Sequence, residues 1–221
     1  MQREGLDSGR KATYIPCDMK TATCPATKGR PREFCTEGAL AAALRVFWTK
    51  GYEGTSLTDL TEAMGITRPS LYAAFGNKEA LFRKALDLYE REKLAYIDQS
   101  LVAPTARGVA ETLLHGALEM QTNPCEPRGC LEVISATACG AEAESIRADV
   151  IARRMPSHLA LIRRLERAKE EGDLPASADP SGLASWLAAI IQGMSVQAGA
   201  GASREDLERL IETSLAMWPS R

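Results

Sequence analysis

The amino-acid sequence predicts an all-α protein in which a three-helix N-terminal unit precedes a longer helical region. Apolar residues recur at intervals of three and four positions, which is the spacing of one face of a helix. No stretch alternates polar and apolar residues convincingly enough to indicate a half-buried strand. The most informative stretch, residues 56–82, reads as a helix, a tight turn, a second short helix and the start of a third. The 221 residues are enough for one or two domains with a sizeable core.

Residues 1–31 form a leader with Gly, Pro, Thr and Ser but no apolar periodicity. The leader lacks the apolar run of a signal peptide. No part of the chain approaches the roughly eighteen apolar residues of a transmembrane helix, so we expect a cytoplasmic protein without membrane contact. Lys28 and Arg30 make a short basic arm that can lie along phosphates or enter a minor groove, and a solvated tail is the alternative. The true start could be Met1 or Met19.

The first helix is expected shortly after the leader. Its apolar face has the i, i+3, i+4, i+7, i+8 spacing of a helix stripe, and residues 50–56, which include two glycines, end it. Three helices of about fifty residues in total could close a small core, although a core of that size is marginal alone. The stripe consists of Leu40, Ala43, Leu44, Phe47 and Trp48.

Residues 56–82 carry clear signals for helix ends. Ser56, with Asp59 three residues on, is a start that resembles a capping box, and Gly65 can end that helix as a C′ residue. Thr67 can cap the next helix, and Asn77 can cap a further one. This succession is the architecture with which a small domain presents one helix to the major groove of DNA.

The second short helix of this unit has two different faces. Leu71 and Phe75, four residues apart, point the same way and can anchor it to the preceding helix. Its other surfaces carry groups that can contact phosphates or base edges, and a lysine at the start of the next helix can clamp a phosphate. An ordinary helical hairpin with solvated charges is the alternative. The predicted DNA-binding residues are Lys28, Arg30, Thr55, Ser56, Thr67, Arg68, Pro69, Ser70, Tyr72, Ala73, Phe75 and Lys78.

Charge is unevenly distributed along the chain, whose formal net charge is −2. Residues 1–86 contain 13 Lys and Arg against 9 Asp and Glu, which gives +4. Residues 87–221 contain 14 against 20, which gives −6. A basic head on an acidic body suits a protein that touches DNA with one end only.

Residues 32–90 resemble the DNA-binding domain of the TetR (tetracycline-repressor-like) transcriptional regulators. The resemblance implies a helix-turn-helix DNA-binding domain followed by a helical effector-binding and dimerisation domain. It also implies a homodimer that binds a palindromic double-stranded DNA operator and releases it when a small-molecule effector binds. We accordingly divide the chain into a leader (1–31), a DNA-binding domain (32–80) and an effector domain (81–221). The matching positions are Ala41–Phe47, Gly51-Tyr52, Thr55-Ser56, Gly65-Ile66, Leu71-Tyr72, Phe75 and Lys78–Phe82.

Beyond residue 90 the chain reads as a run of helices. The helix that begins at Lys78 is expected to continue to Ile97. Pro156 is expected to break or kink a later helix near its middle, because proline removes a backbone hydrogen bond. Further helices are expected over residues 109–120, 131–141, 146–169, 182–198 and 204–218.

The last two predicted helices carry apolar stripes that include small residues. Small residues permit close helix approach across a two-fold axis, as in a four-helix bundle. An intrachain core would give the same stripes, and the family resemblance is what favours a dimer. The predicted dimer residues are Trp186, Ala189, Ile190, Gly193, Leu207, Leu210, Ile211, Leu215 and Trp218.

The six cysteines are expected to be free thiols in a reducing cytosol. None is spaced C-x-x-C, and only His115 and His158 could add imidazole ligands, so we predict neither a metal site nor a cofactor. Cys130 follows Arg128 at the start of a helix, where a thiol tends towards a lower pKa and higher reactivity. Residues 128–131 also resemble a branch of the same family that responds to electrophiles through a thiol here; a buried small hydrophobe is the alternative. The predicted effector-sensing residues are Cys130, Tyr96, His115 and His158.

Two classes of function remain. The first is a transcriptional repressor that responds to a small molecule or an electrophile and is not an enzyme. The second is a thiol- or metal-dependent helical enzyme in which the helix-turn-helix is incidental. The sequence contains no Ser-His-Asp order, paired carboxylate site, phosphate loop or H-E-x-x-H motif, so it gives the second class little support.

Overall fold

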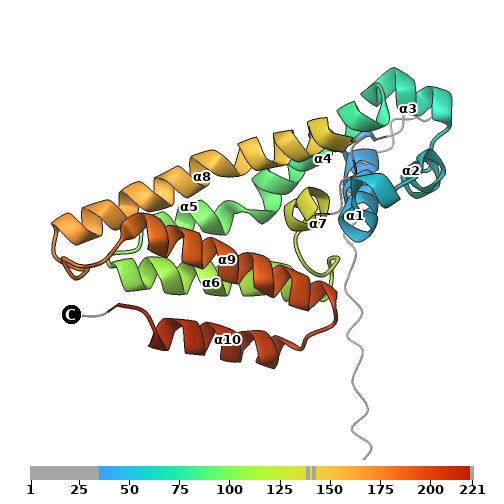
Figure 1. The fold of residues 1–221 in the computed structure, drawn as a ribbon. Helices are drawn as coiled ribbons and strands as arrows, with labels where there is room; N and C mark the ends of the chain where they lie inside the picture. Colours follow the sequence, from blue (N-terminus) through green and yellow to red (C-terminus); the bar gives the residue numbers. More distant parts are fainter. Residues whose placement is uncertain (1–34, 138–139, 141–142, 220–221) are drawn as a thin grey trace, which may run out of the picture.

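The computed structural model describes residues 35–137, 140 and 143–219 (Figure 1). These residues form ten α-helices and no strand, which confirms the predicted all-α class. Within the same residues, no helix has the length and apolarity needed to cross a membrane. The predicted basic arm at Lys28 and Arg30 lies outside the described residues. The helices are α1 (Thr36–Gly54), α2 (Leu57–Met64), α3 (Arg68–Phe75), α4 (Lys78–Lys93), α5 (Ala95–Leu101), α6 (Ala106–Thr122), α7 (Leu131–Thr137), α8 (Glu144–Glu170), α9 (Pro180–Gly199) and α10 (Arg204–Ala216).

The molecule has a small head and an elongated body. The head consists of α1, α2, α3 and the first turns of α4, and the body contains α5 to α10. Figure 1 shows α2 and α3 at one end of the molecule, while α6, α8 and α9 run lengthwise through the body. Helix α10 packs on α6 and α9 at the side of the body away from α8. Helix α1 packs against α4, α2 and α7, so it links head and body.

The predicted helix ends of the head are confirmed. The Asp59 backbone N–H donates to Ser56 Oγ at 3.0 Å, and the Ser56 backbone N–H donates to the Asp59 carboxylate at 2.9 Å. A hydrogen bond from the Lys50 ammonium, followed by those from Ser56, lowers the pKa of Asp59 to about 2, so this cap stays charged at neutral pH. Gly65 ends α2 with φ 65°, and the side chain of Thr67 caps α3. These bonds join residues close in sequence, which is why the sequence predicts them.

The body helices differ from the prediction at the end of α4 and at Pro156. Helix α4 ends at Lys93, because Leu94 adopts φ −103° and ψ 8° and separates it from α5. Helix α7 spans Leu131–Thr137, and its predicted end near residue 141 lies outside the described residues. Helix α8 runs unbroken through Pro156. Pro156 is exposed, so water can bind the carbonyl that loses its helical hydrogen bond.

Two hydrophobic clusters make up the described core. The first joins α1–α4 to α7 and the start of α8, and the second joins α6, the later part of α8, α9 and α10. The first cluster contains the edge-to-face ring pairs Phe47–Phe82, at 5.0 Å between centroids, and Trp48–Tyr89, at 4.8 Å. The core therefore crosses the predicted domain boundary between residues 80 and 81, and the head packs directly on the body.

Gly51 occupies a backbone conformation that only glycine adopts readily. Its φ of 70° and ψ of 174° interrupt the last turn of α1, and this region is essentially restricted to glycine. A Cβ at Gly51 would also approach Ile134 Cγ2 to 3.2 Å. Gly54, three residues on, is helical and exposed, and a Cβ there would meet Lys50 Cβ at an ordinary 3.7 Å.

We therefore expect Gly51→Ala to lower the free energy of unfolding by about 1–3 kcal/mol. The matched control Gly54→Ala should leave it unchanged or raise it by up to roughly 1 kcal/mol, because alanine favours the helix and restricts the unfolded chain. Urea unfolding followed by circular dichroism measures both. Equal effects of the two substitutions would show that Gly51 is not conformationally required.

Candidate DNA-binding surface and candidate ligand cavity

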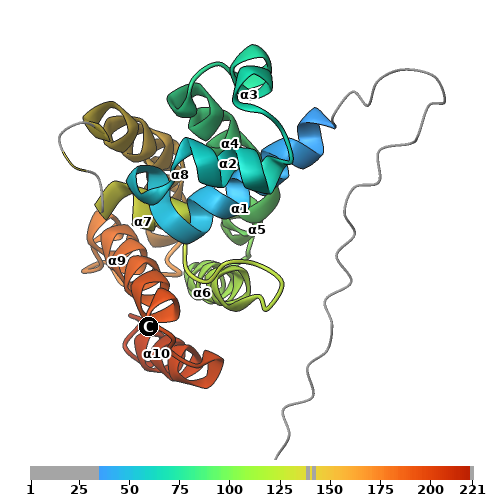
Figure 2. The ribbon, with the colours of Figure 1, turned by 90° about the vertical axis from the view of Figure 1, so that its right-hand side faces the viewer.

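Helix α3 is fixed by one face and presents the other to solvent. Leu71 and Phe75 are buried in the first cluster. The opposite face is open at the end of the molecule, where α3 projects beyond α4 (Figure 2). Tyr72 is 49% exposed although it is a large aromatic side chain. The predicted contact residues with exposed side chains are Ser56, Thr67, Arg68, Pro69, Tyr72 and Ala73, and Ser70 is half-buried.

The polar groups of this face are held in place by short-range hydrogen bonds. Arg68 Nη2 donates to Thr58 Oγ1 at 2.9 Å, which ties α3 to α2. The hydroxyls of Thr67 and Ser70 lie 3.0 Å apart at the start of α3. The face thus offers a guanidinium, two hydroxyls and a phenol, groups that donate hydrogen bonds to phosphates or base edges.

Lys78 lies at the start of α4, beside the α3 face. Its ammonium lies 4.4 Å from the centroid of the Tyr52 ring, and partial burial lowers its pKa. Asn77 caps α4 by accepting a hydrogen bond from the Ala80 backbone N–H at 2.8 Å. A cation therefore lies at the positive end of the α4 dipole, an arrangement that favours an anionic ligand such as a phosphate.

Two predicted DNA-binding residues are buried and cannot reach DNA with their side chains. Thr55 is 1% exposed, and its hydroxyl donates to the Gly51 carbonyl at 2.7 Å. Phe75 is 3% exposed within the first cluster. Both side chains pack beneath the exposed surface. Their predicted role in DNA contact is therefore corrected to a structural role.

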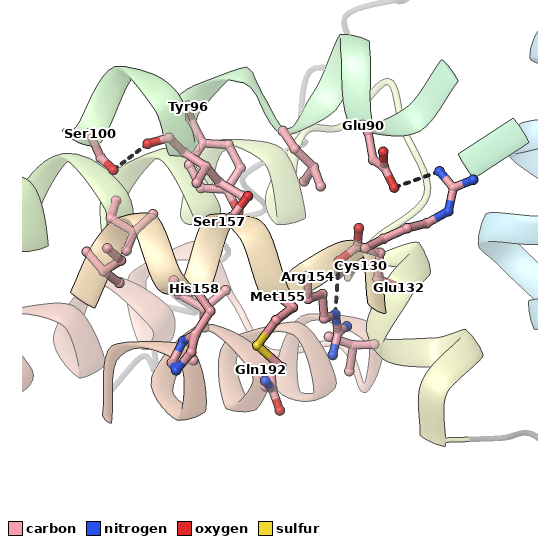
Figure 3. A pocket seen from close by; sticks show the side chains of 18 of the residues that line it. Glu90, Tyr96, Ser100, Cys130, Glu132, Arg154, Met155, Ser157, His158 and Gln192 are labelled. Carbon is pink, nitrogen blue, oxygen red and sulfur yellow. Dashed lines mark hydrogen bonds and ion pairs between the residues drawn. The ribbon is translucent and has the colours of Figure 1, made fainter. Parts of the chain in front are cut away.

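A cavity of about 620 Å³ is bordered by parts of α4 to α9 (Figure 3). Three of the four predicted sensing residues line it, namely Cys130, Tyr96 and His158. His115 is exposed on α6 and does not line it. The rest of the lining is largely aliphatic, with a few hydroxyl and amide groups. Such a mixture suits a mainly apolar small molecule held by one or two hydrogen bonds.

The two arginines in the cavity wall are paired with acidic side chains. Glu132 is 7% exposed, and its Oε2 accepts a hydrogen bond from Arg154 Nε at 3.0 Å. Burial raises the pKa of Glu132, and Arg154 opposes that shift. Arg153 forms ion pairs with Asp87 at 2.7 Å and with Glu90 at 3.1 Å. Each arginine of the wall therefore has an acidic partner, and a further carboxylate that lines the cavity, Asp98, is exposed to solvent.

Sequence reasoning missed Arg154 and Gln192 as cavity residues. Arg154 precedes His158 by four positions, so the two side chains share one face of α8, and this spacing could have identified it. Gln192 lies on α9, and the sequence gives no signal that this part of α9 borders a cavity. Figure 3 shows both side chains at the cavity.

Cys130 lies in the cavity wall, but its surroundings are not those of a reactive thiol. Its side chain is 6% exposed, and Sγ accepts a hydrogen bond from the Tyr89 hydroxyl at 3.3 Å. Burial, together with the carboxylate of Glu132, raises the pKa of the thiol. The guanidinium of Arg128 donates to the Ala202 carbonyl and not to the sulfur. The predicted lowering of this pKa is therefore wrong, because burial outweighs the helix N-terminus.

The apolar stripe of α10 faces the protein's own core. Leu207 and Ile211 are fully buried, and Leu215 and Trp218 are nearly so, all within the second cluster. Leu210 is half-buried against the same cluster. The intrachain alternative therefore applies to α10, and Leu207, Ile211, Leu215 and Trp218 are corrected to core residues.

An apolar surface remains exposed on α8 and α9. Ile151, Met155 and Leu159 follow each other at four-residue intervals along α8, with 44%, 48% and 43% of their surface exposed. On α9, Ala189 is exposed, and a Cβ added at Gly193 would meet no atom within 4 Å. The two remaining predicted dimer residues, Trp186 and Ile190, are half-buried against the second cluster.

The cysteines and histidines of the described part form no metal site. No group of three or more His, Cys, Asp or Glu side chains in that part is placed to hold a metal ion. Cys125 is disulfide-bonded, which corrects the expectation of free thiols for this residue, because spacing along the chain does not show which residues meet in space. Cys17, Cys24 and Cys139 lie outside the described residues.

Comparisons with known proteins agree over both parts of the chain. Residues 39–85 match the model of bacterial regulatory proteins of the tetR family, and residues 110–214 match the tetracyclin repressor-like C-terminal domain. The HTH-type transcriptional repressor ComR of Escherichia coli (strain K12) is 35% identical over 196 residues, which cover 87% of this chain and 93% of ComR. The HTH-type transcriptional regulator YezE of Bacillus subtilis (strain 168) is 32% identical over 197 residues, covering 86% and 98%.

A solved structure with high similarity contains DNA. It is a cysteine mutant of the TetR family transcriptional regulator CifR complexed with 26bp double-strand operator DNA. The identity is 44%, the TM-score is 0.79, and the match covers 86% of this chain and 100% of that chain.

The environment of Cys130 predicts slow alkylation. The thiolate is the reacting form, and burial both raises the thiol pKa and hinders access. We expect iodoacetamide to modify Cys130 at pH 7 at least about tenfold more slowly than a short peptide thiol, with the rate still rising above pH 9. Mass spectrometry of the peptide that contains Cys130 gives the rates. Modification at pH 7 as fast as that of the peptide thiol would contradict the raised pKa.

Proposed function

The chain belongs to the TetR family of transcriptional regulators, and on this premise we propose that it is a repressor with a small-molecule effector. In this proposal, a dimer binds a palindromic operator through α3 and the start of α4. A molecule bound in the cavity of the body then releases the DNA. Its matched relatives are regulators and not enzymes, so the thiol- or metal-dependent enzyme is rejected. A cytoplasmic location follows from the need to reach chromosomal DNA.

The exposed face of α3 is the observation that carries the proposal. Arg68 and Tyr72 project from a helix whose other side is locked in the core, so binding DNA requires little rearrangement of α3. Lys78 and the α4 dipole add a phosphate contact beside that face. CifR, which is 44% identical, is described in complex with operator DNA, and this supports the same use of the matching residues here.

A dimer is proposed through the exposed surface on α8 and α9. Met155 and Leu159 on α8, with Ala189 and Gly193 on α9, supply apolar and small side chains suited to close packing about a two-fold axis. The core position of the α10 stripe leaves α9 as the part of the predicted interface that is open to a partner. The 26bp operator in the CifR complex is long enough for two half-sites separated by one helical turn, about 34–36 Å.

A non-covalent effector fits the cavity better than an electrophile does. The lining is largely apolar and its two arginines are already paired with carboxylates, so the wall suits a neutral molecule. Cys130 is buried with a raised pKa, which disfavours rapid attack on an electrophile. If electrophiles such as quinones or aldehydes release the DNA from the wild type but not from Cys130→Ser, the covalent account replaces the non-covalent one.

The DNA-binding proposal is tested with three variants of the surface. We expect Arg68→Ala and Tyr72→Ala each to weaken binding to a duplex from upstream of the protein's own gene by about 1–3 kcal/mol, or roughly 5- to 150-fold. Lys78→Ala should weaken binding to all duplexes and reduce the salt slope by about 1. Fluorescence anisotropy at several salt concentrations measures these effects.

The matched control is Arg209→Ala on α10, an exposed arginine far along the chain from the proposed surface. It should bind DNA like the wild type, and none of the surface variants should unfold more readily in urea. If all four variants bind equally well, α3 is not the reading helix and the proposal fails.

The dimer proposal is tested by placing a charge on the α8 surface at Leu159, which is 43% exposed and does not line the cavity. Leu159→Glu should convert a micromolar dimer into a monomer in sedimentation experiments, because a carboxylate would be desolvated at the interface. The control is Met217→Glu, which changes an apolar residue that is 65% exposed beyond α10 and should leave the dimer intact. A wild type that is monomeric yet binds a half-site tightly, or an unaffected Leu159→Glu dimer, would exclude this interface.

A further inference from the structure

The cavity lies at the junction of the two hydrophobic clusters. Cys130 and Val133 line it and belong to the first cluster, which contains the helices of the head. Leu113 and Leu161 line it and belong to the second cluster, which contains α9 and α10. A molecule that fills the cavity therefore presses on the cluster of the head and on that of the body at once.

One short backbone segment, residues 128–130, is bonded to both sides of this junction; we call it the connecting segment. The Trp48 indole N–H on α1 donates to the Gly129 carbonyl at 3.1 Å. The next residue, Cys130, donates its backbone N–H to Ser195 Oγ on α9 at 2.8 Å. Adjacent residues of the segment are thus held by the head and by the body, and the Gly129 backbone N–H also donates to the Gln121 carbonyl on α6 at 3.2 Å.

The packing around the connecting segment leaves it little freedom to move alone. A Cβ at Gly129, where φ is 84°, would lie 3.0 Å from the Ser195 carbonyl oxygen. Trp48 is fully buried and packs edge-to-face on Tyr89, whose hydroxyl donates to Cys130 Sγ at 3.3 Å. A shift of Cys130 away from a cavity occupant must therefore move Gly129, and with it the bond to Trp48.

We propose that the connecting segment transmits occupancy of the cavity to α1, with Trp48 and Ser195 as the positioning residues at its two ends. The inference rests on the proposed function, because it describes how the cavity controls the head. Ser195 holds the segment against α9 when the cavity is empty. An occupant displaces the Cys130 wall, and the Trp48 bond carries that displacement into the helix on which α2 packs.

A second route would run along α4, which begins beside α3 and reaches the cavity through Glu90, with Leu94 directly after its last residue. This route does not use the Trp48 bond. Removing the indole N–H therefore separates the two possibilities, because it leaves the cavity residues of α4 unchanged.

In the experiment, a larger side chain at Ala188 takes the place of a ligand, because Ala188 on α9 lines the cavity. Ala188→Phe should weaken binding to the upstream duplex by at least about tenfold, within the usual range of allosteric coupling. Trp48→Phe retains a buried ring but loses the donor, and Ser195→Ala loses the acceptor. In either background the effect of Ala188→Phe should shrink to less than about threefold.

Two matched controls make the same chemical changes elsewhere in the core. Trp218→Phe alters a buried tryptophan of the second cluster, and Ser214→Ala removes a buried hydroxyl that bonds the Leu210 carbonyl within α10. Both backgrounds should retain the full effect of Ala188→Phe. Urea unfolding of every variant verifies that comparisons are made between folded proteins.

A second readout does not depend on DNA. In protein labelled with 15N-tryptophan, Ala188→Phe should shift the indole N–H signal of Trp48 and leave that of Trp218 in place, and Ser195→Ala should abolish the shift. An unmoved Trp48 signal overturns the inference. An equal loss of DNA affinity on Ala188→Phe with and without the Trp48 donor also overturns the inference, because it would assign the transmission to α4. A shifted Trp48 signal with unchanged DNA affinity in every variant supports the connecting segment and overturns the proposed release.

Discussion

Trp48 is buried at the place where the head and the body meet, and the position of the head depends on this contact. The indole packs on Tyr89 of α4 and donates its N–H to the carbonyl of Gly129 in the body. Around it, the first cluster runs without interruption from α2 and α3 to α7 and α8. A three-helix unit of this size is marginal as an independent domain, so the head draws stability from the body. In the proposed transmission, the same contact carries a change in the body into the head.

The position of the cavity would allow a bound molecule to act on this contact between head and body. It lies between the cluster that contains the head and the cluster that contains α9 and α10. Two ion pairs, Glu132 with Arg154 and Arg153 with Glu90, lie in its wall. Such partly buried ion pairs contribute little net stability because desolvation offsets their attraction. Their presence in a largely apolar wall is understandable if they provide the few polar contacts that orient a ligand.

The sequence predicts best those features that are decided within one turn of chain. The capping bonds of Ser56 and Thr67 and the left-handed Gly65 follow from residues three or four positions apart, and all are confirmed. The apolar face of α3 is predicted for the same reason, since Leu71 and Phe75 are separated by one helical turn.

Features decided by distant partners are predicted less well. The α10 stripe around Ile211 is equally consistent with a core and an interface, and only the packing of α10 on α6 and α9 resolves the choice. The pKa of Cys130 depends on burial among Tyr89 and Glu132, which the local sequence does not show. The ligand cavity needs several helices at once, and Gln192 could not be assigned to it from the sequence.

The central claim, that the head reads DNA with α3 and the start of α4, is tested most directly by hydrogen exchange. Amide exchange measured by mass spectrometry, with and without a saturating duplex from upstream of the protein's own gene, locates the DNA without any substitution. The account predicts slower exchange over residues 67–80 and unchanged exchange over α10. Protection confined to the body, or no protection over residues 67–80 at saturation, would contradict it.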